Sequence, residues 1–119
     1  MRRSGMQTTQ DREAHWQRGT DLTEQQLEAL GILQEECAEV IQEASKIRRS
    51  GPDFCRKGTD INNLVHFQTE VMDMRLLLEI CMRLGVFVEP SIDQVAKYRK
   101  YKIERLRKWS KLGDILDEL

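Results

Sequence analysis

Residues 23–50 read TEQQLEALGILQEECAEVIQEASKIRRS, and this stretch decides the fold class. Its apolar side chains recur every three or four residues, as they do along one side of a helix. Thr23 and Gln26 form a capping box at its start, and Gly51 with Pro52 ends it. The apolar positions are Leu27, Leu30, Leu33, Cys37, Val40, Ile41, Ala44 and Ile47. The stretch predicts one long amphipathic helix.

Two further helices are predicted downstream. The second begins near Thr59 or Asp60 and stops near Gly85, while the third begins with a capping box at Ser91 and runs to about Leu112. No segment alternates apolar and polar residues with a period of two over a useful length. We therefore expect an all-α fold, an antiparallel helical bundle. The apolar stripe of the second helix is Leu64, Phe67, Val71, Met74, Leu78, Cys81 and Met82.

The length of 119 residues predicts a single domain. Residues 1–20 are polar with weak periodicity and are expected to form a flexible N-terminal arm, residues 21–112 the helical domain, and residues 113–119 a C-terminal tail. Three apolar stripes bury little surface on their own. We therefore expect self-association, as a homodimer or a homotetramer, to complete the core.

The composition excludes several classes of protein. The net charge of −1 gives no global field toward nucleic acid, and no apolar run is long enough to span a bilayer. Three cysteines without a C-x-x-C pair argue against a disulfide framework and a structural zinc site. We expect a soluble, cytoplasmic protein with no membrane partner, and we do not expect nucleic acid to be a partner.

Four acidic residues form two pairs with the same spacing. Glu36 and Glu39, and likewise Glu70 and Asp73, are three residues apart, so each pair projects from one side of its helix. Each pair is expected beside the apolar stripe of its helix, displaced in the same rotational sense. Antiparallel helices would then bring the pairs together, and both pairs lie at a similar distance from the predicted turn.

Carboxylates gathered in this way repel one another unless their pKa values rise or a divalent cation neutralises them. All-oxygen ligation favours Mg²⁺ or Mn²⁺ over zinc. The absence of Glu-x-x-His disfavours a di-iron bundle, and His66, one turn before Glu70, is expected at a polar edge or next to a ligand. The competing interpretation is a solvated acidic face without any metal.

The motifs Glu35-Glu36-Cys37-Ala38-Glu39 and Glu70-Val71-Met72-Asp73 resemble the E-E-x-x-E … E-x-x-D pattern of the MazG-like all-α nucleoside triphosphate pyrophosphohydrolases, especially small phage-type members. The resemblance covers roughly residues 23–110. It implies Mg²⁺-dependent hydrolysis of a nucleoside or deoxynucleoside triphosphate to the monophosphate and pyrophosphate. It also implies that Glu36, Glu39, Glu70 and Asp73 hold the metal, and that Glu35 supports the site or positions the attacking water.

Phosphate and base contacts are expected outside the acidic motifs, because the chain has no Gly-rich phosphate loop. Lys97, Arg99 and Lys102 on the third helix could meet phosphates, or could instead pair with the acids. Trp16 and Tyr98 could stack on a nucleobase, although Trp16 could equally cover the end of the bundle.

Two other functions remain open at this point. The apolar stripes could be the seam of a non-enzymatic interaction module, with the acids facing solvent. Residues 97–111 carry eight basic residues and one acid and could bind a nucleic-acid backbone, although half of that helix is apolar and is expected to pack.

Overall fold

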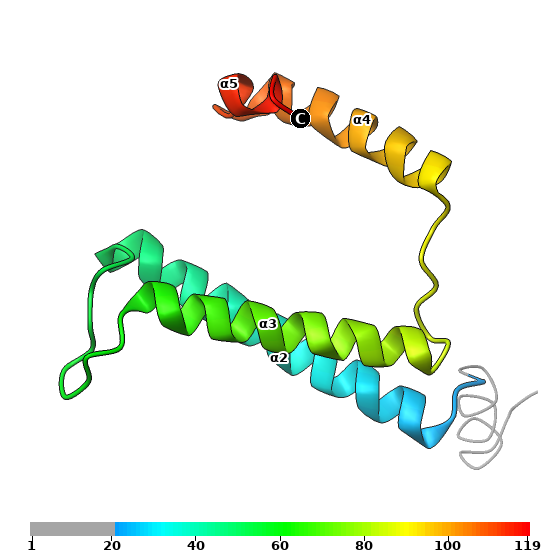
Figure 1. Ribbon diagram of the computed structural model, residues 1–119, viewed down its shortest axis with the longest axis horizontal. Coiled ribbons are helices and arrows are strands. Elements are labelled where there is room, and N and C mark those ends of the chain that lie inside the picture. The colour runs from blue at the N-terminus through cyan, green and yellow to red at the C-terminus, as the bar shows by residue number, and fades with distance from the viewer. Residues whose placement is uncertain (1–20) are drawn as a thin grey trace, which may run out of the picture. The chain divides into compact units, whose positions relative to one another are not determined.

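A computed structural model of the chain describes residues 21–119 and confirms the predicted all-α class for them. The helices are α2 (Glu24–Ser50), α3 (Asn63–Arg83), α4 (Ile92–Trp109) and α5 (Gly113–Leu116), as Figure 1 shows. The described residues contain no strand, only an isolated bridge between Cys55 and Asn62. The predicted arm, residues 1–20, lies outside the described residues. The chain divides after Phe87 into two compact units.

The start of α2 follows the predicted capping box. The Thr23 hydroxyl accepts a hydrogen bond from the Gln26 backbone N–H at 3.1 Å, and the Gln26 side-chain oxygen accepts one from the Thr23 N–H at 3.0 Å. The helix ends at Ser50 because Gly51 has a φ of 86°, a backbone conformation that residues other than glycine rarely adopt. Local sequence alone therefore sets both ends of this helix.

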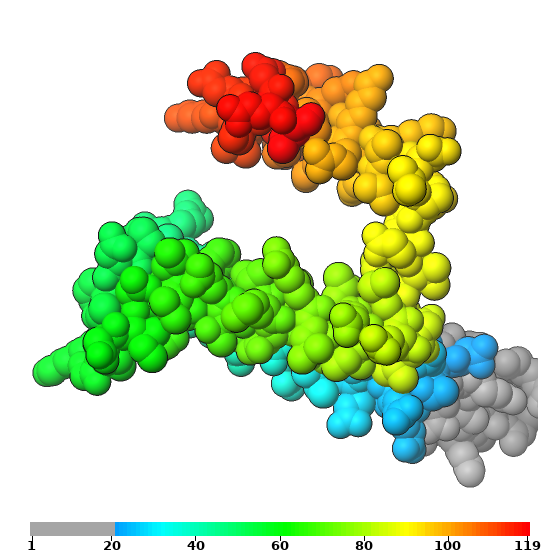
Figure 2. All heavy atoms as spheres, viewed as in Figure 1, coloured from blue at the N-terminus to red at the C-terminus, as the bar shows by residue number. Residues whose placement is uncertain are grey.

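Helices α2 and α3 run antiparallel and pack against each other (Figures 1 and 2). At one end, Gln26 Nε2 donates a hydrogen bond to the Leu84 carbonyl at 2.7 Å, which joins the start of α2 to the end of α3. At the other end, Asn63 Nδ2 donates to the Gly51 carbonyl at 3.0 Å and contacts the Lys46 carbonyl at 3.5 Å. Side-chain amides thus satisfy carbonyls that the helix ends leave free.

The second helix begins later than the sequence predicts. Its N-cap is Asn62, whose side chain accepts a hydrogen bond from the Val65 N–H at 2.9 Å, rather than Thr59 or Asp60. The intervening residues bond within the loop, where the Thr59 N–H donates to the Arg56 carbonyl at 3.0 Å. Because Thr, Asp and Asn all cap helices well, the choice among them depends on these loop contacts.

The predicted stripes describe the buried side of the α2–α3 pair only in part, since Cys81 of the second stripe is buried as predicted but other buried residues lie outside the stripes. The least exposed side chains in the pair are small or polar: Ala29, Glu43, Asn63 and Cys81. Several large apolar residues of the predicted stripes are instead exposed, among them Leu27, Ile41 and Leu64. Periodicity alone does not predict which stripe members are exposed, because the distance between two helices depends on the side chains at the contact.

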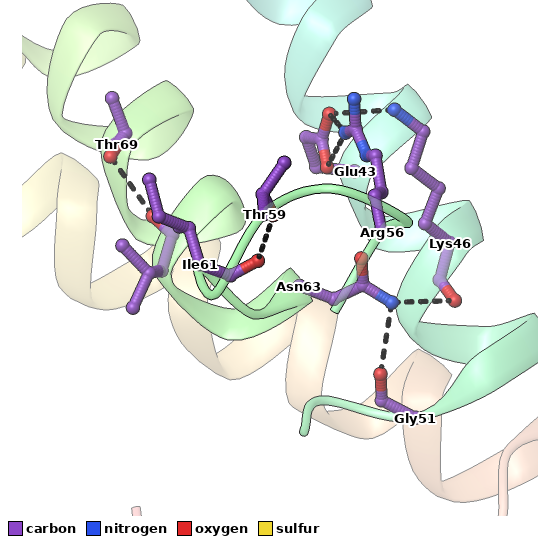
Figure 3. A network of polar contacts seen from close by, with 9 residues as sticks. Glu43, Lys46, Gly51, Arg56, Thr59, Ile61, Asn63 and Thr69 are labelled. Atoms are coloured by element: carbon purple, nitrogen blue, oxygen red, sulfur yellow. Dashed lines mark hydrogen bonds and ion pairs between the residues drawn. The ribbon is translucent and has the colours of Figure 1, made fainter. Parts of the chain in front are cut away.

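Glu43 is a buried carboxylate with two cationic partners, shown in Figure 3. Only 7% of its surface is exposed. Its Oε1 atom accepts from Lys46 Nζ at 2.9 Å and from Arg56 Nη2 at 3.0 Å, and Arg56 Nη2 also lies 3.3 Å from Oε2. Since Arg56 belongs to the loop and Lys46 to α2, Glu43 ties the loop to the helix pair.

Replacing Glu43 with glutamine is expected to destabilise the fold by about 2 kcal/mol, because two charge-assisted hydrogen bonds lose their anionic acceptor. Urea unfolding followed by circular dichroism would measure the change. Glu28→Gln, at an exposed position of the same helix, is the matched control and should change the free energy of unfolding by less than about 0.5 kcal/mol. Equal stability of the two variants would contradict the assignment.

The second unit contains α4 and α5. Ser91 caps α4 in a capping box with Gln94, as predicted, but the helix ends at Trp109 rather than near Leu112. The Ser110 hydroxyl donates to the Leu106 carbonyl at 2.6 Å, which closes the helix. Leu116 of α5 is buried, and Figure 2 shows α5 (red) against the end of α4 (orange). No residue of α4 itself is buried.

Neither a disulfide nor a membrane-spanning helix occurs in the part of the chain that the structure describes. Cys37, Cys55 and Cys81 are free, as expected from their spacing. Across residues 21–119, every helix is too short or too polar to cross a membrane.

Candidate metal centre

The facing sides of α2 and α3 bring together three of the four predicted metal ligands. One carboxylate oxygen from each of Glu36, Glu70 and Asp73 lies within 4.8 Å of the other two. The pairs therefore converge at the same depth of the antiparallel hairpin, as their spacing predicts. Glu39 is not one of these three, although its carboxyl contacts that of Glu70.

Glu36 and Glu70 lie in the seam between the helices, not beside it as the sequence argument placed them. Glu36 is seven residues from both Ala29 and Glu43, so all three share one side of α2. Glu70 is seven residues after the buried Asn63 and shares its side of α3. Both glutamates are half-buried, whereas Asp73 is exposed at the edge of the seam.

The seam leaves polar atoms of this cluster without partners. Glu36 Oε2 and Glu70 Oε2 are buried and accept no hydrogen bond. His66 Nε2 is also buried and has no hydrogen-bond partner. Among residues 21–119, no lysine, arginine or histidine forms an ion pair with Glu36, Glu70 or Asp73. Since a buried carboxylate normally needs a counter-charge, this arrangement leaves a place for a cation.

Both seam glutamates of the cluster hold protons more tightly than usual. Hydrogen bonding with the Glu39 carboxyl, together with burial and the charges of Glu39, Asp73 and Glu36, raises the pKa of Glu70 from 4.5 to about 7. Burial and neighbouring carboxylates raise the pKa of Glu36, although hydrogen bonding with Glu70 opposes the shift. Repulsion within the cluster is therefore relieved by protonation when no cation is present.

Glu43 provides an internal comparison, since it occupies the same seam two turns from Glu36. Burial raises the pKa of Glu43, but the hydrogen bonds and charges of Lys46 and Arg56 outweigh burial and leave the pKa below its ordinary value. The protein thus neutralises one seam glutamate with its own cations and leaves the other two without any. This difference distinguishes the cluster from an ordinary buried ion pair.

In the absence of divalent metal, the stability of the fold is expected to fall as the pH rises through about 7. The folded state holds a proton on Glu70 up to this pH, whereas the unfolded chain loses it near 4.5, so the stabilisation is complete below 4.5 and is lost above 7. Melting temperatures measured in EDTA between about pH 4.5 and pH 8 would show this loss of stability. A melting temperature that rises steadily from pH 5 to pH 8 would contradict the expected direction.

The donor set fits a hard divalent cation. Three carboxylates provide only oxygen, which suits Mg²⁺ or Mn²⁺, and the buried oxygens without partners are the atoms that such an ion would satisfy. Glu36, Glu70 and Asp73 would hold it, with Glu39 next to Glu70. Glu35 is exposed on α2, adjacent in sequence to Glu36.

The sequence does not predict the role of Glu43, and it does not place the predicted phosphate and base contacts relative to the cluster. The sequence prediction does not include Glu43, although its spacing of seven residues from Glu36 and the presence of Lys46 three residues later could indicate a buried ion pair. The predicted phosphate and base contacts Lys97, Tyr98, Arg99 and Lys102 are all exposed on α4, in the second unit. Trp16 lies outside the described residues.

Comparisons of the chain with protein-family models, with curated proteins and with solved structures find no significant match.

Proposed function

We propose that this protein is a Mg²⁺-dependent nucleoside triphosphate pyrophosphohydrolase of the MazG-like type. It would convert a nucleoside or deoxynucleoside triphosphate to the monophosphate and pyrophosphate. The observation that carries the proposal is the seam cluster, where Glu36, Glu70 and Asp73 converge with buried oxygens that no partner satisfies. The resemblance of residues 35–39 and 70–73 to the family pattern supports the same activity.

The chemistry needs charge neutralisation and an aligned water more than a protein nucleophile. When bound, Mg²⁺ would neutralise phosphate oxygens and lower the pKa of a coordinated water. Glu36, Glu70 and Asp73 would hold the ion, and Glu39 would add negative charge beside Glu70. Glu35 takes the proton of the water that attacks the α-phosphorus; the bond to the bridging oxygen breaks, and pyrophosphate leaves.

Substrate contacts are proposed on α4. Lys97, Arg99 and Lys102 would meet phosphate oxygens, and Tyr98 would stack on the base, a role proposed also for Trp16. A ring face tolerates any nucleobase, so we expect discrimination among bases to be weak at these residues.

Pyrophosphate release from a panel of ribonucleoside and deoxyribonucleoside triphosphates, with and without Mg²⁺, tests the proposal. We expect release only with Mg²⁺ or Mn²⁺, together with the monophosphate in equal amount. Release of orthophosphate instead would assign the cleavage to a different bond. Folded protein with no turnover of any triphosphate would favour the alternative of a non-enzymatic interaction module.

Self-association is proposed as well, because apolar side chains of both units are exposed. Leu27, Ile41 and Met72 lie exposed on the α2–α3 pair, and Ile92 lies exposed on α4. A helix with no buried residue gains little stability from packing, so α4 in particular needs a partner surface. We expect a homodimer or homotetramer in sedimentation velocity at micromolar concentration; a monomer alone would contradict this proposal.

A further inference from the structure

Helix α4 carries an aromatic ladder along one side, made of Tyr98, Tyr101, Arg105 and Trp109. These positions are spaced by three, four and four residues, so they follow one line along the helix. The Arg105 guanidinium lies 5.6 Å from the ring centre of Tyr101 and 4.9 Å from that of Trp109. Arg105 Nη1 also donates to the Tyr101 hydroxyl at 3.3 Å, and the Tyr98 and Tyr101 ring centres are 6.4 Å apart.

The ladder is open to solvent. Tyr98, Tyr101 and Trp109 are 69%, 54% and 70% exposed, although the Arg105 guanidinium lies over two of these rings. The apolar side of α4, which carries Ile92 and Ile103, is centred roughly 120° away around the helix. Packing of that apolar side against another surface therefore does not require the ladder to be covered.

The ladder is also strongly basic. Residues 97–111 contain eight lysines and arginines and one acid. Lys97, Lys102 and Lys108 flank the rings, whereas the acid, Glu104, projects roughly 105° from the centre of the ladder. Proteins that bind single-stranded nucleic acid combine aromatic rings with basic side chains. The unpaired bases stack on the rings, and the cations contact the phosphates.

We propose that the ladder binds single-stranded nucleic acid. Bases stack on the open faces of Tyr98, Tyr101 and Trp109, and Arg105 with the flanking lysines contacts the phosphates. The ladder is roughly 16 Å long, which spans about three to five nucleotides. Two features argue against nucleic acid as a partner: the rest of the chain is acidic, and half of this helix is apolar and is expected to pack. Because the apolar side is separate from the aromatic side, packing of the apolar side leaves the ladder open.

Duplex nucleic acid is not the expected ligand. Paired bases present their edges, not their faces, so rings on a helix surface cannot stack on them without opening the duplex. Binding to single strands should depend on the rings, whereas binding driven by charge alone should not.

Fluorescence anisotropy with the full chain tests the proposal, using a labelled twelve-nucleotide single strand in EDTA, which prevents metal-dependent turnover. We expect saturable binding at 50 mM salt, with a slope of about −3 in the logarithm of affinity against that of salt, for about four phosphate contacts. Oligo-deoxythymidine and oligouridine should both bind, and a duplex of the same length or a mononucleotide should compete at least tenfold less well.

Matched variants separate stacking from charge. Tyr101→Leu with Trp109→Leu should weaken binding at least tenfold. Arg105→Gln should weaken it more than Lys100→Gln, which removes the same charge from another side of α4. Glu70→Gln should bind as the unchanged protein does. Circular dichroism confirms that each variant is folded, and the Arg105–Lys100 comparison stands if the double ring variant is not.

Three results would overturn the proposal. One is an absence of saturable binding at 50 mM salt. Another is an equal loss of affinity in Arg105→Gln and Lys100→Gln with no effect of the ring substitutions. The third is displacement by polyglutamate as efficient as displacement by unlabelled single strand, which would assign the surface to an acidic protein partner instead.

Discussion

Glu70→Gln is expected to lower the rate of Mg²⁺-dependent pyrophosphate release about a thousandfold, the scale expected when a metal loses an anionic ligand at the reacting phosphate. Glutamine keeps the size of the side chain but removes its charge. Glu70 has a buried carboxylate oxygen without a hydrogen-bond partner, and its pKa is raised to about 7. Initial rates at saturating triphosphate, with Mg²⁺ varied, would measure the effect.

Glu79→Gln is the matched control for this prediction. Glu79 lies on the same helix, is exposed and forms an ion pair with Arg83 at 3.7 Å, a surface pair of the kind that contributes little to stability. Its rate should stay within about twofold of the unchanged protein. A Glu70→Gln variant that retains full activity, or a Glu79→Gln variant that loses as much as Glu70→Gln, would remove the seam cluster from the mechanism.

The second large effect concerns stability with and without metal. At one hundred times its dissociation constant, Mg²⁺ should stabilise the protein by about 2.7 kcal/mol. For a chain of this length that corresponds to a rise of roughly 10 °C in melting temperature. The double variant Glu36→Gln/Glu70→Gln should show no such rise. Its metal-free form should melt above the metal-free unchanged protein at pH 8, since the repulsion among these carboxylates is gone.

Differential scanning calorimetry at pH 8, in EDTA and in Mg²⁺, would measure both effects. Glu43→Gln serves as the contrast, because it should melt at a lower temperature yet still respond to Mg²⁺. If the double variant melts below the unchanged protein in EDTA, the two glutamates contribute to folding as Glu43 does, and the interpretation of the cluster as a cation site is wrong.

The ends of the helices were predictable where short-range chemistry decides them. Thr23 and Ser91 each have a glutamine three residues later, and both capping boxes form. The start of α3 was not predictable in this way, because Thr59, Asp60 and Asn62 are all good caps. Loop contacts decide it, among them the hydrogen bond from the Asn63 N–H to the Phe54 carbonyl at 2.9 Å.

The convergence of acids from both helices was predictable from spacing and antiparallel direction, but their depth in the seam was not. The apolar pattern places Leu27, Ile41 and Leu64 on the stripes, yet these side chains are exposed, whereas Ala29 and Asn63, which lie outside the stripes, are buried. Which glutamate the protein neutralises with its own cations also depends on the loop, since Arg56 reaches Glu43 from thirteen residues away. Periodicity along one helix carries no information about such a contact.

The central claim, that Glu36, Glu70 and Asp73 together bind a divalent cation, is tested most directly by crystallography of the protein with Mn²⁺ and anomalous scattering at the manganese edge. We expect a peak coordinated by oxygens of these three residues, at roughly 2.0–2.3 Å. Strong anomalous density elsewhere, or none in the seam at a saturating Mn²⁺ concentration and pH 8, would contradict it.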